Sequence, residues 1–340
     1  MSRILHILVC LFALSLGSLF GQGMTLAGGG YSDPSIIRVA PGQVTTLFVI
    51  GLRTVLSSQP ARATNLPLPS ALAGISVTLN QAGQQPLPVP LLSLQQMSIC
   101  SNGGAPPPPP GLTPGPPSGL TPDCLITTIT AQIPFELDVA NGHTKEQVAE
   151  LTVSENGNVS KAFRILPITD NLHILNTCDA FPSEGSFGNS CNAVVTHGDG
   201  TPVTANSPAK AGETVVIYAF GLGQTSPAVK TGEASPMPAA SVFSGVSIQF
   251  DFRPNAGPSR PYINPLIMAP VVFGPVFVGL TPQQVGLYQI NLRIPDNLPP
   301  LQPCGAAAVV AANTVQTNLT LDIGGVTSFD GAAICVQPPQ

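Results

Sequence analysis

The sequence predicts an all-β fold of two tandem antiparallel sandwiches with immunoglobulin-like packing, placed after a signal peptide. Two observations lead to this prediction. Four segments recur in the same order in the two halves of the chain, and most of them alternate apolar with polar residues. An alternation with a period of two separates the side chains onto the two faces of a strand, so it indicates strands and excludes helices.

The repeat starts with a turn that leads into a strongly apolar strand. Residues 41–52 (PGQVTTLFVIGL) return as residues 211–222 (AGETVVIYAFGL). Within them, residues 47–50 and 215–220 are continuously apolar, which is typical of strands covered on both faces. We therefore expect a central strand of each lobe at these positions.

Three more segments recur with the alternating pattern of half-buried strands. The pairs are 74–80 with 245–251, 126–134 with 287–295 and 151–160 with 319–328. The repeat spacing of about 170 residues matches the size of a whole domain and is too long for a solenoid repeat.

The duplication predicts three regions: a signal peptide over residues 1–23, a first sandwich over 24–170 and a second sandwich over 171–340. A closed barrel is the alternative architecture. The chain has no tryptophan, so the term immunoglobulin-like describes the architecture alone. One helix signal occurs over residues 144–151, where Thr144 and Gln147 have capping-box spacing, and it predicts a single turn.

The amino-terminal segment predicts export to the cell surface or the medium. Arg3 precedes an apolar run over residues 4–20, and small residues follow it at Gly21 and Gly23. This is the pattern of a cleaved signal peptide. A retained membrane helix is the alternative, but the run is short for a span of about 20 residues, and we expect no membrane span after cleavage.

Cleavage removes Cys10 and leaves an even number of cysteines, which in an exported chain indicates disulfides. Pairing of sequence neighbours keeps each bond within one lobe or junction. The expected bonds are Cys100 with Cys124, Cys178 with Cys191 and Cys304 with Cys335. A zinc site is the competing use, and it is disfavoured because the chain has no CxxC pair.

A proline-rich loop over residues 101–123 lies between the first two of these cysteines. It contains an unbroken run of prolines at residues 106–110, so we expect polyproline II conformation and no packing into a core. The loop is either a recognition element for a proline-binding partner or an insertion tolerated in a surface turn, and the insertion is the simpler explanation.

The composition excludes some classes of partner and cofactor. Charged residues make up 9% of the chain and the net charge is -5, so no basic stripe is present to bind nucleic acid. Gly221-Leu222-Gly223 resembles the start of a dinucleotide-binding loop, but Ser226 replaces the third glycine and Pro227 prevents the required helix. We expect a tight turn there and no cofactor.

Histidine chemistry has no local motif in this chain. His143, His173 and His197 lie far apart, and neither a GxSxG elbow nor an HExxH helix is present. Residues 197–200 (HGDG) predict a turn, with a metal site as a weaker alternative. We therefore predict no catalytic, cofactor-binding or metal-binding residues.

Two alternative functions stay open. A hydrolase with dispersed catalytic residues requires a cleft in which His173 or His197 reaches a serine and a carboxylate. A carbohydrate-binding module requires exposed aromatic rings. Tyr218 and Tyr288 occupy apolar strand positions, which leaves Tyr31 and Tyr262 as possible ligand contacts.

Several motifs of the second half resemble a known family. They are residues 192–200 (NAVVTHGDG), 207–213 (SPAKAGE), 221–223 (GLG), 278–282 (VGLTP) and 286–295 (GLYQINLRIP). In this order they resemble the uncharacterised C-terminal domain family named after Solibacter. The resemblance implies an exported domain, often appended to larger extracellular proteins, with no established activity and no catalytic or binding residues to carry over. The first half resembles the family more loosely.

Together these observations predict a secreted or cell-surface protein that is not an enzyme and has a structural, adhesive or protein-binding role. The expected partner is a protein or another component of the cell envelope, and the sequence carries no signal for an oligomeric state.

Overall fold

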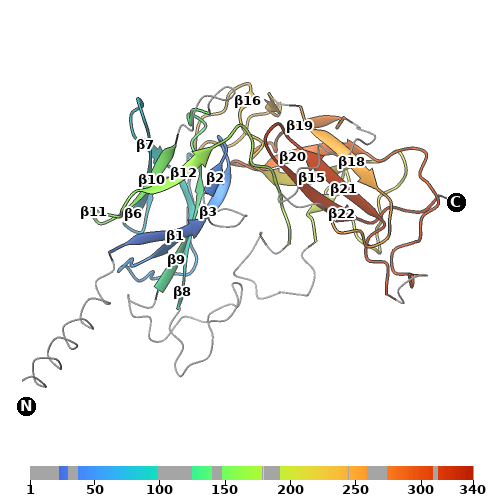
Figure 1. The fold of residues 1–340 in the computed structure, drawn as a ribbon, viewed down its shortest axis with the longest axis horizontal. Helices are drawn as coiled ribbons and strands as arrows, with labels where there is room; N and C mark the ends of the chain where they lie inside the picture. Colours follow the sequence, from blue (N-terminus) through green and yellow to red (C-terminus); the bar gives the residue numbers. More distant parts are fainter. Residues whose placement is uncertain are drawn as a thin grey trace, which may run out of the picture.

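The computed structural model describes residues 23–29, 37–98, 125–139, 148–177, 179, 192–243, 245–258, 274–308 and 313–339. Within these ranges the regular structure consists of strands, and no helix occurs. The strands form four sheets arranged as two sandwiches side by side, the first drawn from blue to green and the second from yellow to red in Figure 1. The predicted all-β sandwich fold is confirmed.

The first sandwich packs two sheets against each other. One sheet has the order β1 (Thr25–Gly29), β3 (Val44–Ile50), β9 (Leu125–Gln132), β8 (Leu91–Ser98) and β4 (Ala61–Arg62). The other has the order β2 (Ile37–Val39), β12 (Phe163–Pro167), β10 (Ala149–Glu155), β6 (Ile75–Gln81) and β5 (Ala71–Leu72), with β7 (Leu87–Val89) on β6 and β11 (Asn158–Val159) on β10.

The second sandwich repeats this plan with a shorter second sheet. Its first sheet has the order β13 (His173–Ile174), β15 (Thr214–Phe220), β20 (Tyr288–Arg293), β19 (Phe277–Leu280), β17 (Ser241–Val242) and β16 (Thr225–Ser226), with β14 (Val195–Thr196) on β15. Its second sheet has the order β18 (Ser247–Asp251), β21 (Leu319–Gly324) and β22 (Phe329–Ile334).

The pairing of the strands follows the sequence repeat. β3 pairs with β9 as β15 pairs with β20, and β6 pairs with β10 as β18 pairs with β21. The parallel pairing of β2 with β12 has a counterpart in the parallel bridge between Ala209 and Val336. The expected helical turn is wrong at residues 149–151, which belong to β10; residues 144–147 lie outside the described ranges.

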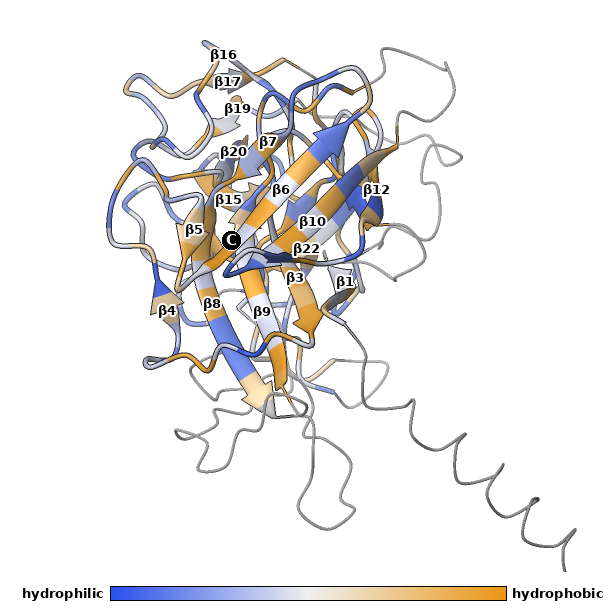
Figure 2. Ribbon diagram, turned by 90° about the vertical axis from the view of Figure 1, so that its left-hand side faces the viewer, coloured by the Kyte–Doolittle hydropathy of each residue, from blue (hydrophilic) through white to orange (hydrophobic). Residues whose placement is uncertain are grey.

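Alternation along the strands builds two hydrophobic cores, one in each sandwich. On β6, Ile75, Val77 and Leu79 are buried while the residues between them are half-buried, and Figure 2 shows this change in hydropathy along the strand. The continuously apolar strands β3 and β15 each lie between two other strands, and their second face is half-buried. Period-two burial therefore places the polar half of β6 and β10 on the outer face.

Residues 168–172 link β12 of the first sandwich to β13 of the second, and two adjacent residues of this linker bond to different sandwiches. The buried carboxylate of Asp170 accepts N–H bonds from Val326 (2.9 Å), Thr327 (3.0 Å) and Ser328 (3.0 Å) in the turn between β21 and β22. The side-chain amide of Asn171 donates to the carbonyl of Arg38, at 2.9 Å, on the first sandwich. The linker is thus bonded to both sandwiches.

A second contact joins the sandwiches away from the linker. The amide N–H of Leu68 donates to the carbonyl of Gly232 (2.8 Å), and the N–H of Gly232 donates to the side chain of Gln132 (2.7 Å). Phe135, which follows β9 of the first sandwich, is buried in the core of the second. The two sandwiches are therefore in direct contact beside the linker as well as through it.

The structure contains the disulfide between Cys304 and Cys335, whose Cα atoms are 6.1 Å apart. The other four cysteines of the predicted bonds, Cys100, Cys124, Cys178 and Cys191, lie outside the described residues, as do the proline-rich loop and residues 1–22 of the predicted signal peptide. Among the described residues, no helix has the length and apolar character needed to cross a membrane.

Candidate functional site

His197 approaches a serine and a carboxylate. It follows β14, in the turn predicted over residues 197–200, where the N–H of Gly200 bonds the carbonyl of His197. Its Nδ1 lies 2.5 Å from Oε1 of Glu213, and its Nε2 lies 3.2 Å from Oγ of Ser207. A serine and a carboxylate therefore both lie within hydrogen-bond reach of this histidine, as the hydrolase alternative requires.

The surrounding bonds favour a structural role for this group. Nε2 of His197 also lies 3.1 Å from the carbonyl oxygen of Ser207, which can only accept a hydrogen bond. Both ring nitrogens therefore face acceptors, and the hydrogen bond to Glu213 raises the pKa of His197. When both ring nitrogens donate to acceptors, the imidazole has no lone pair with which to act as a general base. The N–H of Ser207 donates to Thr204 at 3.1 Å, so it is not directed at an oxyanion.

His173 is held between two carboxylates in the second sandwich. Its Nε2 lies 2.7 Å from Oδ2 of Asp179, and its Nδ1 lies 3.3 Å from Oδ2 of Asp330. Burial lowers the pKa of His173, but hydrogen bonds to the two carboxylates outweigh burial, so the pKa is raised. Asp330 also accepts the N–H of Ile174 at 2.9 Å. This cluster pins β13 to β22.

The Gly221-Leu222-Gly223 segment holds the linker between the sandwiches. A Cβ at Gly221 would collide with the carbonyl oxygen of Asn171, and one at Gly223 would collide with the carbonyl oxygen of Thr169. The glycines are needed because the linker passes directly over them, which explains the motif without a nucleotide.

Neither of the two predicted ligand contacts falls within the described ranges, whereas Tyr288 lies in the core as its apolar strand position predicts. Tyr31 and Tyr262 both lie outside them. Tyr288 is fully buried, its hydroxyl donates to the carbonyl of Gly223, and burial raises its pKa. The described residues contain no group of three or more His, Cys, Asp or Glu side chains placed to hold a metal ion.

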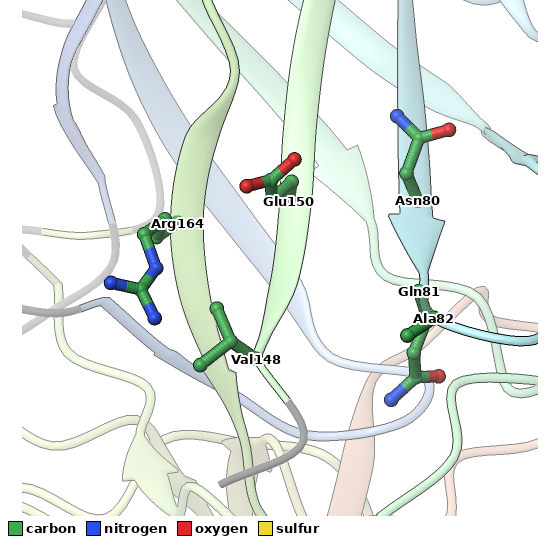
Figure 3. Close-up of a pocket in the computed structure, with 6 residues that line it drawn as sticks. All are labelled: Asn80, Gln81, Ala82, Val148, Glu150 and Arg164. Carbon is green, nitrogen blue, oxygen red and sulfur yellow. The ribbon is translucent and has the colours of Figure 1, made fainter.

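An open hollow of about 670 Å³ lies on the outer face of the first sandwich (Figure 3). Its lining residues are Asn80, Gln81, Ala82, Val148, Glu150 and Arg164. Three of them form a row across neighbouring strands, because Glu150 of β10 is the direct partner of Asn80 on β6 and of Arg164 on β12. Period-two alternation puts this row on the face opposite the core.

The polar groups of this row are free to bind a ligand. Within the described part of the chain, the side chains of Asn80, Glu150 and Arg164 have no hydrogen bond or ion pair. Glu150 and Arg164 are exposed and Asn80 is half-buried. By contrast, the amide of Gln81 is used internally, because it donates to the carbonyl of Asp138 at 2.8 Å.

Sequence reasoning did not identify this row. Alternation predicts that Asn80 faces solvent, but it gives no register between strands that are about 70 residues apart in the sequence. Arg164 lies in a segment without a recognisable repeat. An exposed carboxylate and an exposed guanidinium at directly paired positions become visible only once the register is known.

Comparison of the sequence with family models and with curated proteins finds no match. Among solved structures, the adhesin InvE of Yersinia pseudotuberculosis aligns with a TM-score of 0.20 and 11% identity, over 92% of this chain and 58% of the adhesin chain. The C-terminal domain of the AgI/II polypeptide BspA of Streptococcus agalactiae aligns with a TM-score of 0.16 and 10% identity, over 91% of this chain and 97% of that one. At such TM-scores neither likeness supports an inference about function.

Proposed function

We propose that this chain is an extracytoplasmic binding protein without catalytic activity, which presents the outer face of β6, β10 and β12 to a partner in the cell envelope. The observation that carries the proposal is the unpaired row of Asn80, Glu150 and Arg164 in an open hollow. The two described histidines, in contrast, are bonded internally to carboxylates.

Export is part of the proposal. It is supported by the basic and apolar start of the sequence and by the Cys304–Cys335 disulfide, since structural disulfides form mainly in oxidising compartments. Membership of the family named after Solibacter stays a prediction from the motifs of the second half.

Retention on cell-envelope material tests the proposed function. Purified full chain is mixed with the envelope fraction of the producing cells and sedimented. We expect the wild type to be retained and a triple variant, Asn80→Ala with Glu150→Ala and Arg164→Ala, to lose at least tenfold in retention.

A matched control removes the same residue types elsewhere. Asn297→Ala, Glu233→Ala and Arg62→Ala together replace an exposed amide, carboxylate and guanidinium away from the hollow. The control variant is expected to bind like the wild type. Equal retention of both triple variants, or no retention of the wild type, contradicts the proposal.

The hydrolase alternative has a specific observation in its favour, the approach of His197 to Ser207 and Glu213. Because the imidazole faces two acceptors and its pKa is raised, we expect a fluorophosphonate probe to leave Ser207 unlabelled at neutral pH. Mass spectrometry of the treated chain reads the result. Labelling of Ser207 that disappears in His197→Ala contradicts the non-catalytic part of the proposal.

A further inference from the structure

The two charges of the hollow cancel, which sets the kind of ligand that it suits. Glu150 carries one negative charge and Arg164 one positive charge, on directly paired residues of β10 and β12. With no net charge, the row attracts neither a polyanion nor a polycation. The balance favours a neutral polar ligand over a charged polymer.

The hydrogen-bonding capacity of the row is complementary to hydroxyl groups. A carboxylate only accepts, a guanidinium only donates, and the amide of Asn80 does both. A hydroxyl group can donate to Glu150 and accept from Arg164, so one ligand type with several hydroxyls satisfies all three side chains. Adjacent hydroxyls also match the paired oxygens of a carboxylate and the fork of an arginine.

The shape of the face suits an extended ligand. Strands lie about 4.8 Å apart, so the row from Asn80 to Arg164 spans about 10 Å, which one or two sugar rings can cover. Along β6 and β10 the row continues on the same face as two pairs of small hydroxyl side chains, Thr78 with Thr152 and Ser76 with Ser154. These small residues leave the face flat, and Val148 supplies an apolar contact at the hollow.

The second sandwich has no counterpart of this row among its described residues. Asp251 occupies the repeat position of Asn80, and its carboxylate accepts a hydrogen bond from Nε of Arg253 at 3.0 Å. Asn318 occupies the repeat position of Glu150, but it is buried and its amide donates to the carbonyl of Gln302 at 2.8 Å. The unpaired polar row is therefore a feature of the first sandwich and is not imposed by the duplicated fold.

We propose that the hollow formed by Asn80, Glu150 and Arg164 binds a neutral carbohydrate through its hydroxyl groups. The inference rests on the proposed binding function and specifies its ligand and site. It differs from stacking on Tyr31 or Tyr262, because recognition here comes from hydrogen bonds on the face of a sheet.

A panel of neutral oligosaccharides tests this proposal on the full chain. Cello-, xylo-, manno-, malto- and laminari-oligosaccharides are immobilised, with polygalacturonate as an acidic probe. We expect binding of at least one neutral sugar, weakened at least tenfold by Glu150→Gln and by Arg164→Gln. Arg62→Gln on β4 is the matched control and is expected to bind like the wild type, and thermal unfolding of each variant confirms that it is folded.

Four results overturn the inference: no neutral sugar binds the wild type, both hollow variants bind unchanged, binding is lost only on Tyr31→Ala or Tyr262→Ala, or polygalacturonate binds more tightly than every neutral sugar. The envelope experiment separates the two proposals. Periodate oxidises the envelope sugars. Retention that depends on the row but is unchanged by periodate contradicts the carbohydrate ligand and still supports the binding function.

Discussion

The same turn occurs once in each sandwich, and the two copies face different surroundings. Gly42 and Gly212 adopt φ values of 73° and 74°. Each donates its N–H to the carbonyl of the residue that directly follows the neighbouring strand, Ile133 after β9 and Ile294 after β20. Two residues beyond those isoleucines the copies differ. The first has Phe135, buried in the core of the other sandwich, and the second has the exposed Asp296.

The side chain at the fourth position of the turn also differs between the two copies, being neutral in the first and charged in the second. Gln43 and Glu213 both cap the turn, accepting the N–H of Ala40 and of Lys210 at 2.8 Å. The oxygen of Gln43 also faces the amide of Asn171 in the linker, while the second oxygen of Glu213 binds His197. A neutral cap suits the fully buried joint, and a charged cap is kept where a histidine can share its charge.

Loss of the aromatic ring at the joint is expected to have the largest effect. Phe135→Ala removes a buried ring from the second core and should lower the free energy of unfolding by about 3–5 kcal/mol. Denaturant titration measures the change. Asp296→Ala, at the repeat position, should change stability by about 0.5 kcal/mol or less. Equal costs at the two positions contradict the proposed difference between the copies.

A charge introduced at the buried cap is the next largest effect. Gln43→Glu places a carboxylate in a fully buried position without a cation bonded to it, and we expect a loss of about 3 kcal/mol at neutral pH. Equilibrium unfolding at pH 7 and at pH 4 checks this, because protonation of the new carboxyl should recover part of the loss. A variant as stable as the wild type at both pH values rules out the charge argument.

The reciprocal change should cost less. Glu213→Gln makes the second turn resemble the first, keeps the cap to Lys210 and removes the charge that His197 binds, so we expect a loss of about 1 kcal/mol. Glu213→Ala removes the cap as well and should cost about 2 kcal/mol. The same denaturant titration compares the two. A loss in Glu213→Gln as large as in Gln43→Glu contradicts the comparison.

The smallest expected effect is a dependence on pH. The folded pKa of His197 is raised above its ordinary value of 6.5, chiefly by the hydrogen bond to Glu213. Its stabilising contribution is fully present below pH 6.5 and is lost as the pH rises through the folded pKa. Between pH 6 and pH 9 the free energy of unfolding should therefore decrease less steeply with pH for Glu213→Gln than for the wild type. Identical slopes for the two proteins exclude this linkage.

The eight strands that the sequence repeat predicts are all present, because alternation and burial are local properties of a strand. The repeated turns are visible for the same reason, since each needs glycine at a fixed place. The helical turn expected over residues 144–151 is wrong at residues 149–151, because capping-box spacing is a weak local signal, whereas pairing of β10 along the whole of β6 provides many bonds.

The candidate site and the joint depend on contacts between distant segments. No local pattern indicates that Phe135 crosses into the other core, or that the carboxylate of Asp170 bonds the turn after β21. The same holds for the row of Asn80, Glu150 and Arg164, which depends on the register of three strands. Register is set by the packing of the whole sandwich.

Hydroxyl-radical footprinting of the full chain, with and without envelope material, tests the binding face most directly, because it reports the solvent exposure of individual side chains. We predict that Val148 and Arg164 lose reactivity when the partner binds, while exposed side chains of the second sandwich such as Phe243 keep theirs. Protection of Phe243 with unchanged reactivity at Val148 and Arg164 would contradict the central claim that the hollow of the first sandwich is the binding face.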